Sequence, residues 1–121
     1  MLISTKLKLE RIINQNLKKN IMQILAISKL KEGVSPDSIG QLGGDEVKHT
    51  VESYLDGKIR SFWFQVNRPG IVFILECSDE NEARGLMNEL PLVVAGMMSV
   101  DLIPLQPLLP LGTLIGRNMS M

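Results

Sequence analysis

Apolar and polar residues follow two different periods along the chain. Runs rich in aliphatic, β-branched and aromatic residues occupy positions 21–30, 59–66 and 71–77, and such runs favour strands. Asn67-Arg68-Pro69-Gly70 separates the last two runs, and Pro followed by Gly is typical of a tight turn. We therefore predict an opening strand, followed later in the chain by a β-hairpin.

A helix is expected between the opening strand and the hairpin. Ser35 suits an N-cap and Pro36 suits the first helical position, where its missing N–H costs nothing. The pair Gly43-Gly44 weakens this helix by about 1 kcal/mol per glycine relative to alanine, so a kink or break there is a reasonable expectation. If the helix continues to Asp56, its inner face comprises Ile39, Glu46, Val47, Thr50, Val51 and Tyr54.

A second helix has a clearer signal. Asp79 and Glu82 form a D-x-x-E capping pattern, and Pro91 ends the helix. A last strand is expected from about Met97 to Leu105. Apolar residues lie at the i, i+3, i+4 and i+7 positions of this amphipathic helix, namely Ala83, Leu86, Met87 and Leu90.

The order β-α-β-β-α-β predicts an α+β, ferredoxin-like domain whose antiparallel sheet carries both helices on one face. The other face has no cover. In the second strand, Phe62 and Phe64 point to one side, while Trp63 and Gln65 point to the other. Neither face is typical of a solvent-exposed surface, so we expect a second copy of the chain to cover the bare one.

We expect three regions in the chain. Residues 1–19 form an N-terminal extension of uncertain order, residues 20–105 form the ferredoxin-like domain, and residues 106–121 form a proline- and leucine-rich tail. Pro107 and Pro110 follow Pro104 at a spacing of three, which favours an extended, polyproline-like geometry. We predict that the tail packs on a neighbouring subunit, and a flexible leucine-rich tail is the alternative.

The amino-acid composition of the chain limits the classes of partner that we expect. The 13 basic and 13 acidic residues cancel, so no net field attracts nucleic acid or an anionic membrane. Cys77 is the single cysteine of the chain, which excludes an internal disulfide and a Cys-based zinc site and fits a reducing compartment. We expect a cytoplasmic domain with no nucleic-acid or membrane partner and no transmembrane segment, and we interpret Cys77 as a buried, inert thiol.

The segment from Pro36 to Pro104 resembles the muconolactone isomerase family of the dimeric α+β barrel superfamily. The resemblance implies a domain that works without metal or organic cofactor and pairs its sheet with that of another copy, as a homodimer or a larger ring, around a ligand cavity. The matching features are Pro36 at the helix start, Gly57-Lys58 at its end, Trp63, the Ser78-Asp79-Glu80 turn and Leu90-Pro91-Leu92.

The resemblance implies proton transfer on a small unsaturated lactone or acid, a task that needs a base near a carbonyl-activated carbon. Glu46 aligns with a glutamate of that family. Its place at the edge of the apolar stripe predicts partial desolvation, which raises the pKa of a carboxyl group. Our hypothesis is that Glu46 transfers the proton, and the alternative is a rim carboxylate exposed to water.

Several other residues are candidates for the ligand site. Trp63 and Gln65 offer an apolar wall and a directional hydrogen-bonding group, although packing between two copies explains them as well. We also include Tyr54 from the inner helix face and Arg60, whose guanidinium suits a carboxylate. Gln23 completes the set, near the start of the first strand, where the isomerase carries a histidine.

No metal site is expected. His49 shares a helix face with Asp45, Glu52 and Asp56, and an exposed, charged face explains this group without a metal. Two functions stay open: an isomerase-like or ligand-binding protein, and a non-catalytic oligomeric module for assembly or protein interaction. An enclosed cavity lined by Trp63, Gln65 and Glu46 favours the first function, and a filled barrel favours the second.

Overall fold

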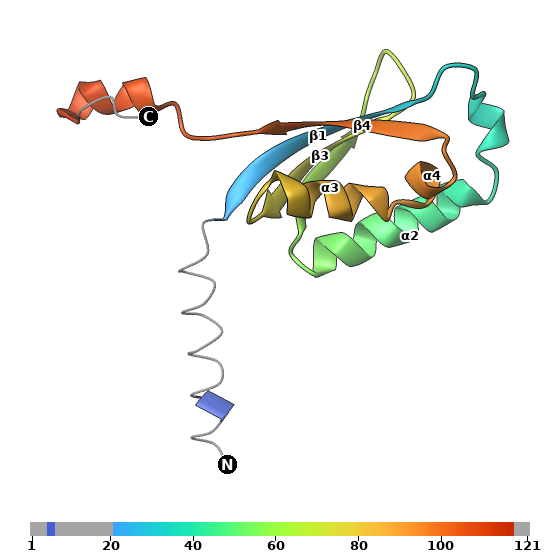
Figure 1. Cartoon of the computed structure of the whole chain (residues 1–121), viewed down its shortest axis with the longest axis horizontal. Coiled ribbons are helices and arrows are strands. Elements are labelled where there is room, and N and C mark those ends of the chain that lie inside the picture. Colours follow the sequence, from blue (N-terminus) through green and yellow to red (C-terminus); the bar gives the residue numbers. More distant parts are fainter. Residues whose placement is uncertain (1–4, 7–20, 118–121) are drawn as a thin grey trace.

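The chain folds into one four-stranded antiparallel sheet with helices on one face (Figure 1). The computed structural model describes residues 5–6 and 21–117. The strands, in the order β2-β3-β1-β4, are β1 (Met22–Leu30), β2 (Ile59–Phe64), β3 (Ile71–Cys77) and β4 (Met98–Pro104). The predicted ferredoxin-like α+β fold is confirmed. Nearly all of the predicted N-terminal extension, residues 1–19, lies outside the described residues.

The first predicted helix divides into two pieces. Ser35 Oγ accepts a hydrogen bond from the Asp37 N–H at 3.3 Å and caps a 3-10 turn, Pro36–Ser38. Gly40 then adopts a left-handed φ of 52°, and α2 (Leu42–Leu55) begins only after it. The expected break at Gly43-Gly44 is therefore misplaced, because these two glycines lie inside the first turn of α2.

The second predicted helix is confirmed as α3 (Glu80–Asn88). Asp79 Oδ1 accepts a hydrogen bond from the Glu82 N–H at 2.7 Å, as the capping pattern predicts. Pro91 does more than end this helix, because it opens a second short one, α4 (Pro91–Val94). Proline suits that first position, where its missing N–H leaves no intrahelical hydrogen bond unmade.

The hydrophobic core lies between the sheet and the helices. β1 runs through the centre of the sheet and contributes Ile24 and Ala26, which are fully buried. The Cys77 thiol of β3 is buried too, and desolvation, with a smaller contribution from the nearby Glu82, raises its pKa to about 11. Other core residues are Ile59, Phe73, Leu75, Ala83, Leu86, Met87, Leu90 and Val100.

The opposite face of the sheet is uncovered within the described part of the chain (Figure 1) and carries an apolar patch bordered by the charged residues Asp101 and Glu76. Strand register places Leu25 and Ile27 of β1 beside Ile74 and Val72 of β3 on this face. Trp63 is 55% exposed and Ile103 is 45% exposed. We call these six residues the open face. Its pairing with a second copy stays a prediction.

The C-terminal tail leaves the sheet at the end of β4. The Leu105 N–H donates to Gln23 O at 2.9 Å, and a 3-10 helix, Leu109–Ile115, then lies beyond the end of the sheet (Figure 1). The polyproline-like geometry predicted for the stretch from Pro104 to Leu111 is therefore wrong from Leu109 onward. Thr113 Oγ1 donates to Pro110 O at 2.8 Å inside that helix. Its packing on a neighbouring subunit stays a prediction.

The β2–β3 turn makes one glycine irreplaceable. Gly70 has a φ of 156°, and a Cβ atom there would lie 2.2 Å from the Ser28 carbonyl oxygen.

We expect Gly70→Ala to lower the free energy of unfolding by roughly 2–4 kcal/mol in urea titrations. Gly85→Ala is the matched control, since Gly85 lies in α3 with nothing within 4 Å of its added Cβ. It should raise stability by about 0.5–1 kcal/mol. Equal effects of the two substitutions would contradict the steric argument.

Candidate functional site

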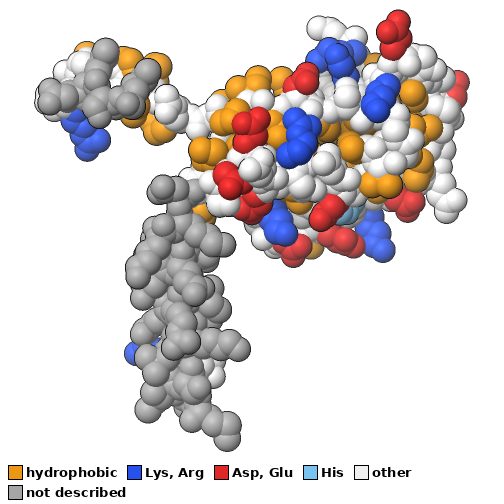
Figure 2. Space-filling view, viewed as in Figure 1, with side chains coloured by type: hydrophobic (Ala, Val, Ile, Leu, Met, Phe, Trp, Pro, Cys, Tyr) orange, Lys and Arg blue, Asp and Glu red, His pale blue; other side chains and the backbone are white. Residues whose placement is uncertain are grey.

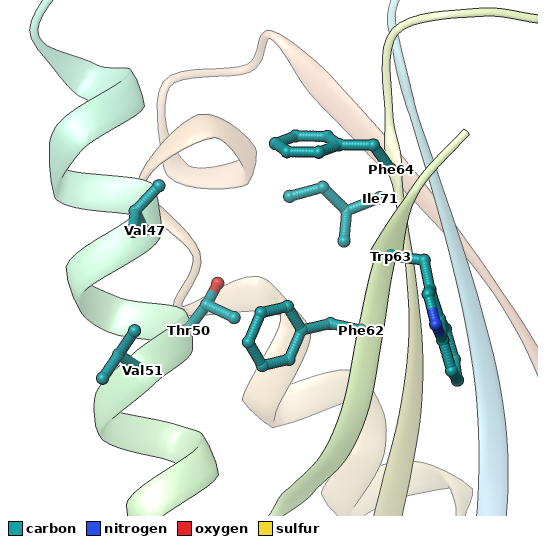
Figure 3. A pocket seen from close by; sticks show the side chains of 7 residues that line it. All are labelled: Val47, Thr50, Val51, Phe62, Trp63, Phe64 and Ile71. Carbon is teal, nitrogen blue, oxygen red and sulfur yellow. The ribbon is translucent and has the colours of Figure 1, made fainter. Parts of the chain in front are cut away.

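An apolar pocket of about 230 Å³ lies between α2 and β2 (Figure 3). The rings of Phe62 and Phe64 point from β2 toward α2, opposite the Thr50 side chain. Pockets for drug-sized ligands span about 300–1,000 Å³, so this one suits a single small ring. Its lining carries no charged residue and consists of Val47, Thr50, Val51, Phe62, Trp63, Phe64 and Ile71.

A β-bulge in β2 sets the direction of the phenylalanines. Ile59 lies opposite Leu75 and Ser61 opposite Ile74, so one extra residue is inserted between them. The bulge shifts the alternation by one position, because in a regular strand residues 59, 61 and 63 would share a face. Phe62 and Phe64 consequently face α2, together with the buried Ile59.

Glu46 is buried in the contact between α2 and α4. Its side chain is 2% exposed, and Oε2 accepts a hydrogen bond from the Leu92 N–H at 2.9 Å. Oε1 is also buried and has no hydrogen-bond partner. Burial raises the pKa of Glu46 above its ordinary value of 4.5, and the Leu92 hydrogen bond and the charge of His49 offset part of that rise. The alternative of a water-exposed rim carboxylate is wrong.

The predicted inner face of the first helix is only partly correct. Glu46 and Thr50 are buried as expected, but Val47, Val51 and Tyr54 are exposed. The Tyr54 ring contacts the Phe62 ring edge to face, with centroids 6.1 Å apart, and it stands outside the pocket lining. α2 packs against α4 and edge strand β2, which leaves much of its apolar stripe uncovered.

Trp63 and Gln65 do not meet Glu46 in one cavity. The Trp63 indole points away from α2, on the opposite side of β2 from Phe62 and Phe64 (Figure 3). The Gln65 amide is engaged near the hairpin turn, where Nε2 donates to Ser28 O at 2.6 Å. Gln65 Oε1 accepts from Arg68 Nε at 2.7 Å, so this amide supports the hairpin.

Arg60 and Gln23 lie near the opposite end of the hairpin from Gln65. Arg60 Nε lies 3.1 Å from Glu76 Oε1 in a salt bridge, and Glu76 is opposite Gln23 in the β1–β3 register. Neither Arg60 nor Gln23 lines the α2–β2 pocket. The candidate ligand residues thus occupy separate places in the described chain, and their joint role in binding stays a prediction.

His49 is placed differently from the sequence-based expectation. It is half-buried, and its Nε2 is buried with no hydrogen-bond partner. The described residues include no group of three or more His, Cys, Asp or Glu side chains arranged to hold a metal ion. The sequence does contain a signal for the placement of His49 beside Glu46. His49 follows Glu46 by three positions, and residues at this spacing are neighbours on a helix.

Comparison with known proteins identifies solved structures that share the fold of this chain. No family model and no curated protein matches the chain. A crystal structure of muconolactone isomerase matches with a TM-score of 0.58 and 18% identity, over 72% of this chain and 93% of that one. The fold is that of muconolactone isomerase.

A second solved structure shares this fold. It is 5-chloro-2-hydroxyhydroquinone dehydrochlorinase (TftG) from Burkholderia phenoliruptrix AC1100, in complex with 2,5-dihydroxybenzoquinone. It matches with a TM-score of 0.51 and 15% identity, over 70% of this chain and 94% of that one. Both matches confirm the resemblance drawn from the sequence at the level of the fold.

None of the described helices is long and apolar enough to cross a membrane.

The burial of Glu46 predicts a pH dependence of stability. Its pKa is higher in the folded than in the unfolded chain, so the folded state holds this proton more tightly. Its contribution to stability is fully present below about pH 4.5 and is lost as pH rises through the folded pKa. Urea titrations across this range should show wild-type stability falling more steeply than that of Glu46→Gln. Parallel curves would contradict a raised pKa.

Proposed function

We propose that the chain is a cofactor-free, muconolactone isomerase-like protein that binds a small unsaturated molecule in the α2–β2 pocket and uses Glu46 for proton transfer. One observation carries this proposal: Glu46 has a buried, unpartnered Oε1 one helical turn from Thr50, which lines the pocket. Glu46 does not itself line the pocket, so the proposal places its buried carboxyl group one helical turn behind the wall formed by Thr50.

The environment of Glu46 suits a group that takes up and returns a proton. A raised pKa brings the protonated and ionised forms of a carboxyl group closer in free energy near neutral pH. The Leu92 N–H holds Oε2, which limits rotation of the carboxyl group and leaves Oε1 for the transfer. A base of this kind can remove a proton from a carbon next to a carbonyl group and return it elsewhere.

The pocket favours an uncharged ring as the ligand. A carboxylate would need a cation, and the lining has none. The candidate cation, Arg60, is paired with Glu76 outside this pocket. The two similar structures bear the names of a lactone isomerase and of a dehydrochlorinase bound to a quinone. Neutral unsaturated lactones and quinones are therefore the first compounds to test.

Glu46→Gln tests this proposal. A panel of neutral unsaturated lactones and hydroxyquinones is incubated with the protein in D₂O, and deuterium incorporation at ring carbons is followed by NMR. We expect wild-type protein to accelerate exchange for at least one compound and Glu46→Gln to slow it by about 10²–10⁴-fold. Glu52→Gln is the matched control, because Glu52 is an exposed carboxylate on the same helix.

Equal exchange rates for wild type and Glu46→Gln would refute the catalytic role. Binding of a compound without any exchange would leave a ligand-binding protein in which Glu46 serves the structure alone.

Self-association is a second proposed function, and the open face favours it. Leu25, Ile27, Val72 and Ile74 of the two central strands lie there beside the exposed indole of Trp63. A contiguous apolar sheet face of this kind is typical of an interaction surface. We propose that a second copy of the chain covers it, which would also serve a non-catalytic oligomeric module.

Trp63→Glu should weaken this association. A carboxylate within an apolar interface loses its hydration without gaining a partner, so we expect the variant to have the mass of a monomer by light scattering at concentrations where wild type forms a larger species. Leu55→Glu is the control, because Leu55 is exposed at the end of α2, outside the open face. A monomeric wild type would refute the proposal.

A further inference from the structure

Three buried side-chain atoms in the described part of the chain have no hydrogen-bond partner, and all three belong to α2. They are Glu46 Oε1, His49 Nε2 and Thr50 Oγ1. The Glu46 and Thr50 side chains are almost fully buried, at 2% and 3% exposure. Buried polar atoms are rarely left unpaired in folded proteins, so this group needs a physical explanation.

Helical geometry brings the three side chains together. At about 100° per residue, His49 lies roughly 60° to one side of Glu46 and Thr50 roughly 40° to the other. All three fall within about one turn of α2. This part of the helix packs against α4, where Glu46 meets the Leu92 N–H, and against β2. Glu46 therefore stands between an imidazole and a hydroxyl group on one buried strip.

The chemistry of the three atoms suits a single water molecule. A carboxylate oxygen accepts a hydrogen bond, a hydroxyl group donates or accepts, and an imidazole nitrogen does either according to its tautomer. Buried waters typically make two to four hydrogen bonds to polar groups that lack other partners. The neighbouring α2–β2 pocket, by contrast, has an apolar lining, so the polar strip is the favoured place for a bound water.

We propose that Glu46, His49 and Thr50 hold one buried water and that this water links Glu46 to solvent through His49. This inference deepens the proposed role of Glu46 and depends on it for its use in catalysis. His49 is half-buried, and Thr50 lines the pocket on the other side of Glu46. Around the helix, His49 thus lies on the solvent side of Glu46, and Thr50 lies on its pocket side.

The transfer of a proton from Glu46 to solvent through this water conserves atoms and charge. The Glu46 Oε1–H bond breaks as its proton passes to the water oxygen, and the water gives one of its own protons to His49 Nε2. The imidazolium then releases its Nδ1 proton to solvent. Glu46 ends as a carboxylate, the water is unchanged, and His49 ends as its Nε2–H tautomer, which returns to the Nδ1–H form by proton exchange with solvent; no oxidant or reductant is needed.

Among the described residues of α2 and of the elements packed against it, α4 and β2, no other titratable side chain competes with His49 for this role. α4, Pro91–Val94, contains no ionisable residue and offers Glu46 only the Leu92 N–H. The one ionisable residue of β2, Arg60, is paired with Glu76. On α2 itself, Asp45, Lys48, Glu52 and Tyr54 are exposed, as is Asp56 just after the helix. The charge of His49 also lowers the pKa of Glu46, against the larger effect of burial.

A high-resolution crystal structure tests the water site. We expect one ordered water within about 3.2 Å of Glu46 Oε1, His49 Nε2 and Thr50 Oγ1. Thr50→Val should lose or displace this water, and Thr50→Ser should retain it. A dry strip in wild type, or direct pairing of the Glu46 and His49 side chains, would overturn the proposal.

A second test follows the protonation of Glu46 by carbon NMR of its carboxyl group and uses no substrate. His49→Gln should slow proton exchange between Glu46 and solvent, because a glutamine amide cannot take up and release the relayed proton. Lys48→Gln removes an exposed cation from the same turn and is the control. Equal behaviour of the two variants would overturn the link through His49. Since neither test requires turnover, a failure of the exchange assay with lactones and quinones is distinguishable from a failure here.

Discussion

The hydrogen bond from the Leu92 N–H to Glu46 Oε2 joins α2 to α4 and determines the character of the site. α4 is a four-residue helix that starts at Pro91, and the free N–H groups at its start need an acceptor. Glu46 supplies one, at the cost of moving its carboxyl group out of water. The burial that comes with this contact raises the pKa of Glu46, although the hydrogen bond itself offsets part of that rise, and the contact fixes one oxygen while the other has no partner.

A second constraint acts through β2, which contributes to two surfaces at once. The bulge between Ile59 and Ser61 turns Phe62 and Phe64 toward α2 and leaves Trp63 on the open face. Figure 2 shows hydrophobic side chains among the charged ones over the surface of the folded domain. A change in the β2 register would therefore alter the pocket and the proposed interface together, because a shift of one residue exchanges the two faces of a strand.

Local signals in the sequence were enough to predict the strands, the Asp79 cap and the helix order. The position of the helix break was not predictable, because Gly40 and Gly43-Gly44 permit similar backbone freedom and tertiary packing decides between them. The sequence predicts an exposed face for His49, because the packing of α2 against α4 and β2 depends on contacts distant in sequence. Gln65 and Arg60 find partners far along the chain, at Ser28 and Glu76, and such contacts leave no local pattern.

The position of β2 at the sheet edge also bears on how a ligand reaches the pocket. β2 pairs only with β3, and edge strands of this kind open locally at a lower free-energy cost than central ones. The Gln65 amide fastens one end of the hairpin to Ser28, while the aromatic wall formed by Phe62 and Phe64 has no strand on its outer side. Phe62 and Phe64 are 42% and 81% exposed, so this wall is already open to solvent, and the proposed ligand would need neither a separate lid nor an opening of the strand to enter.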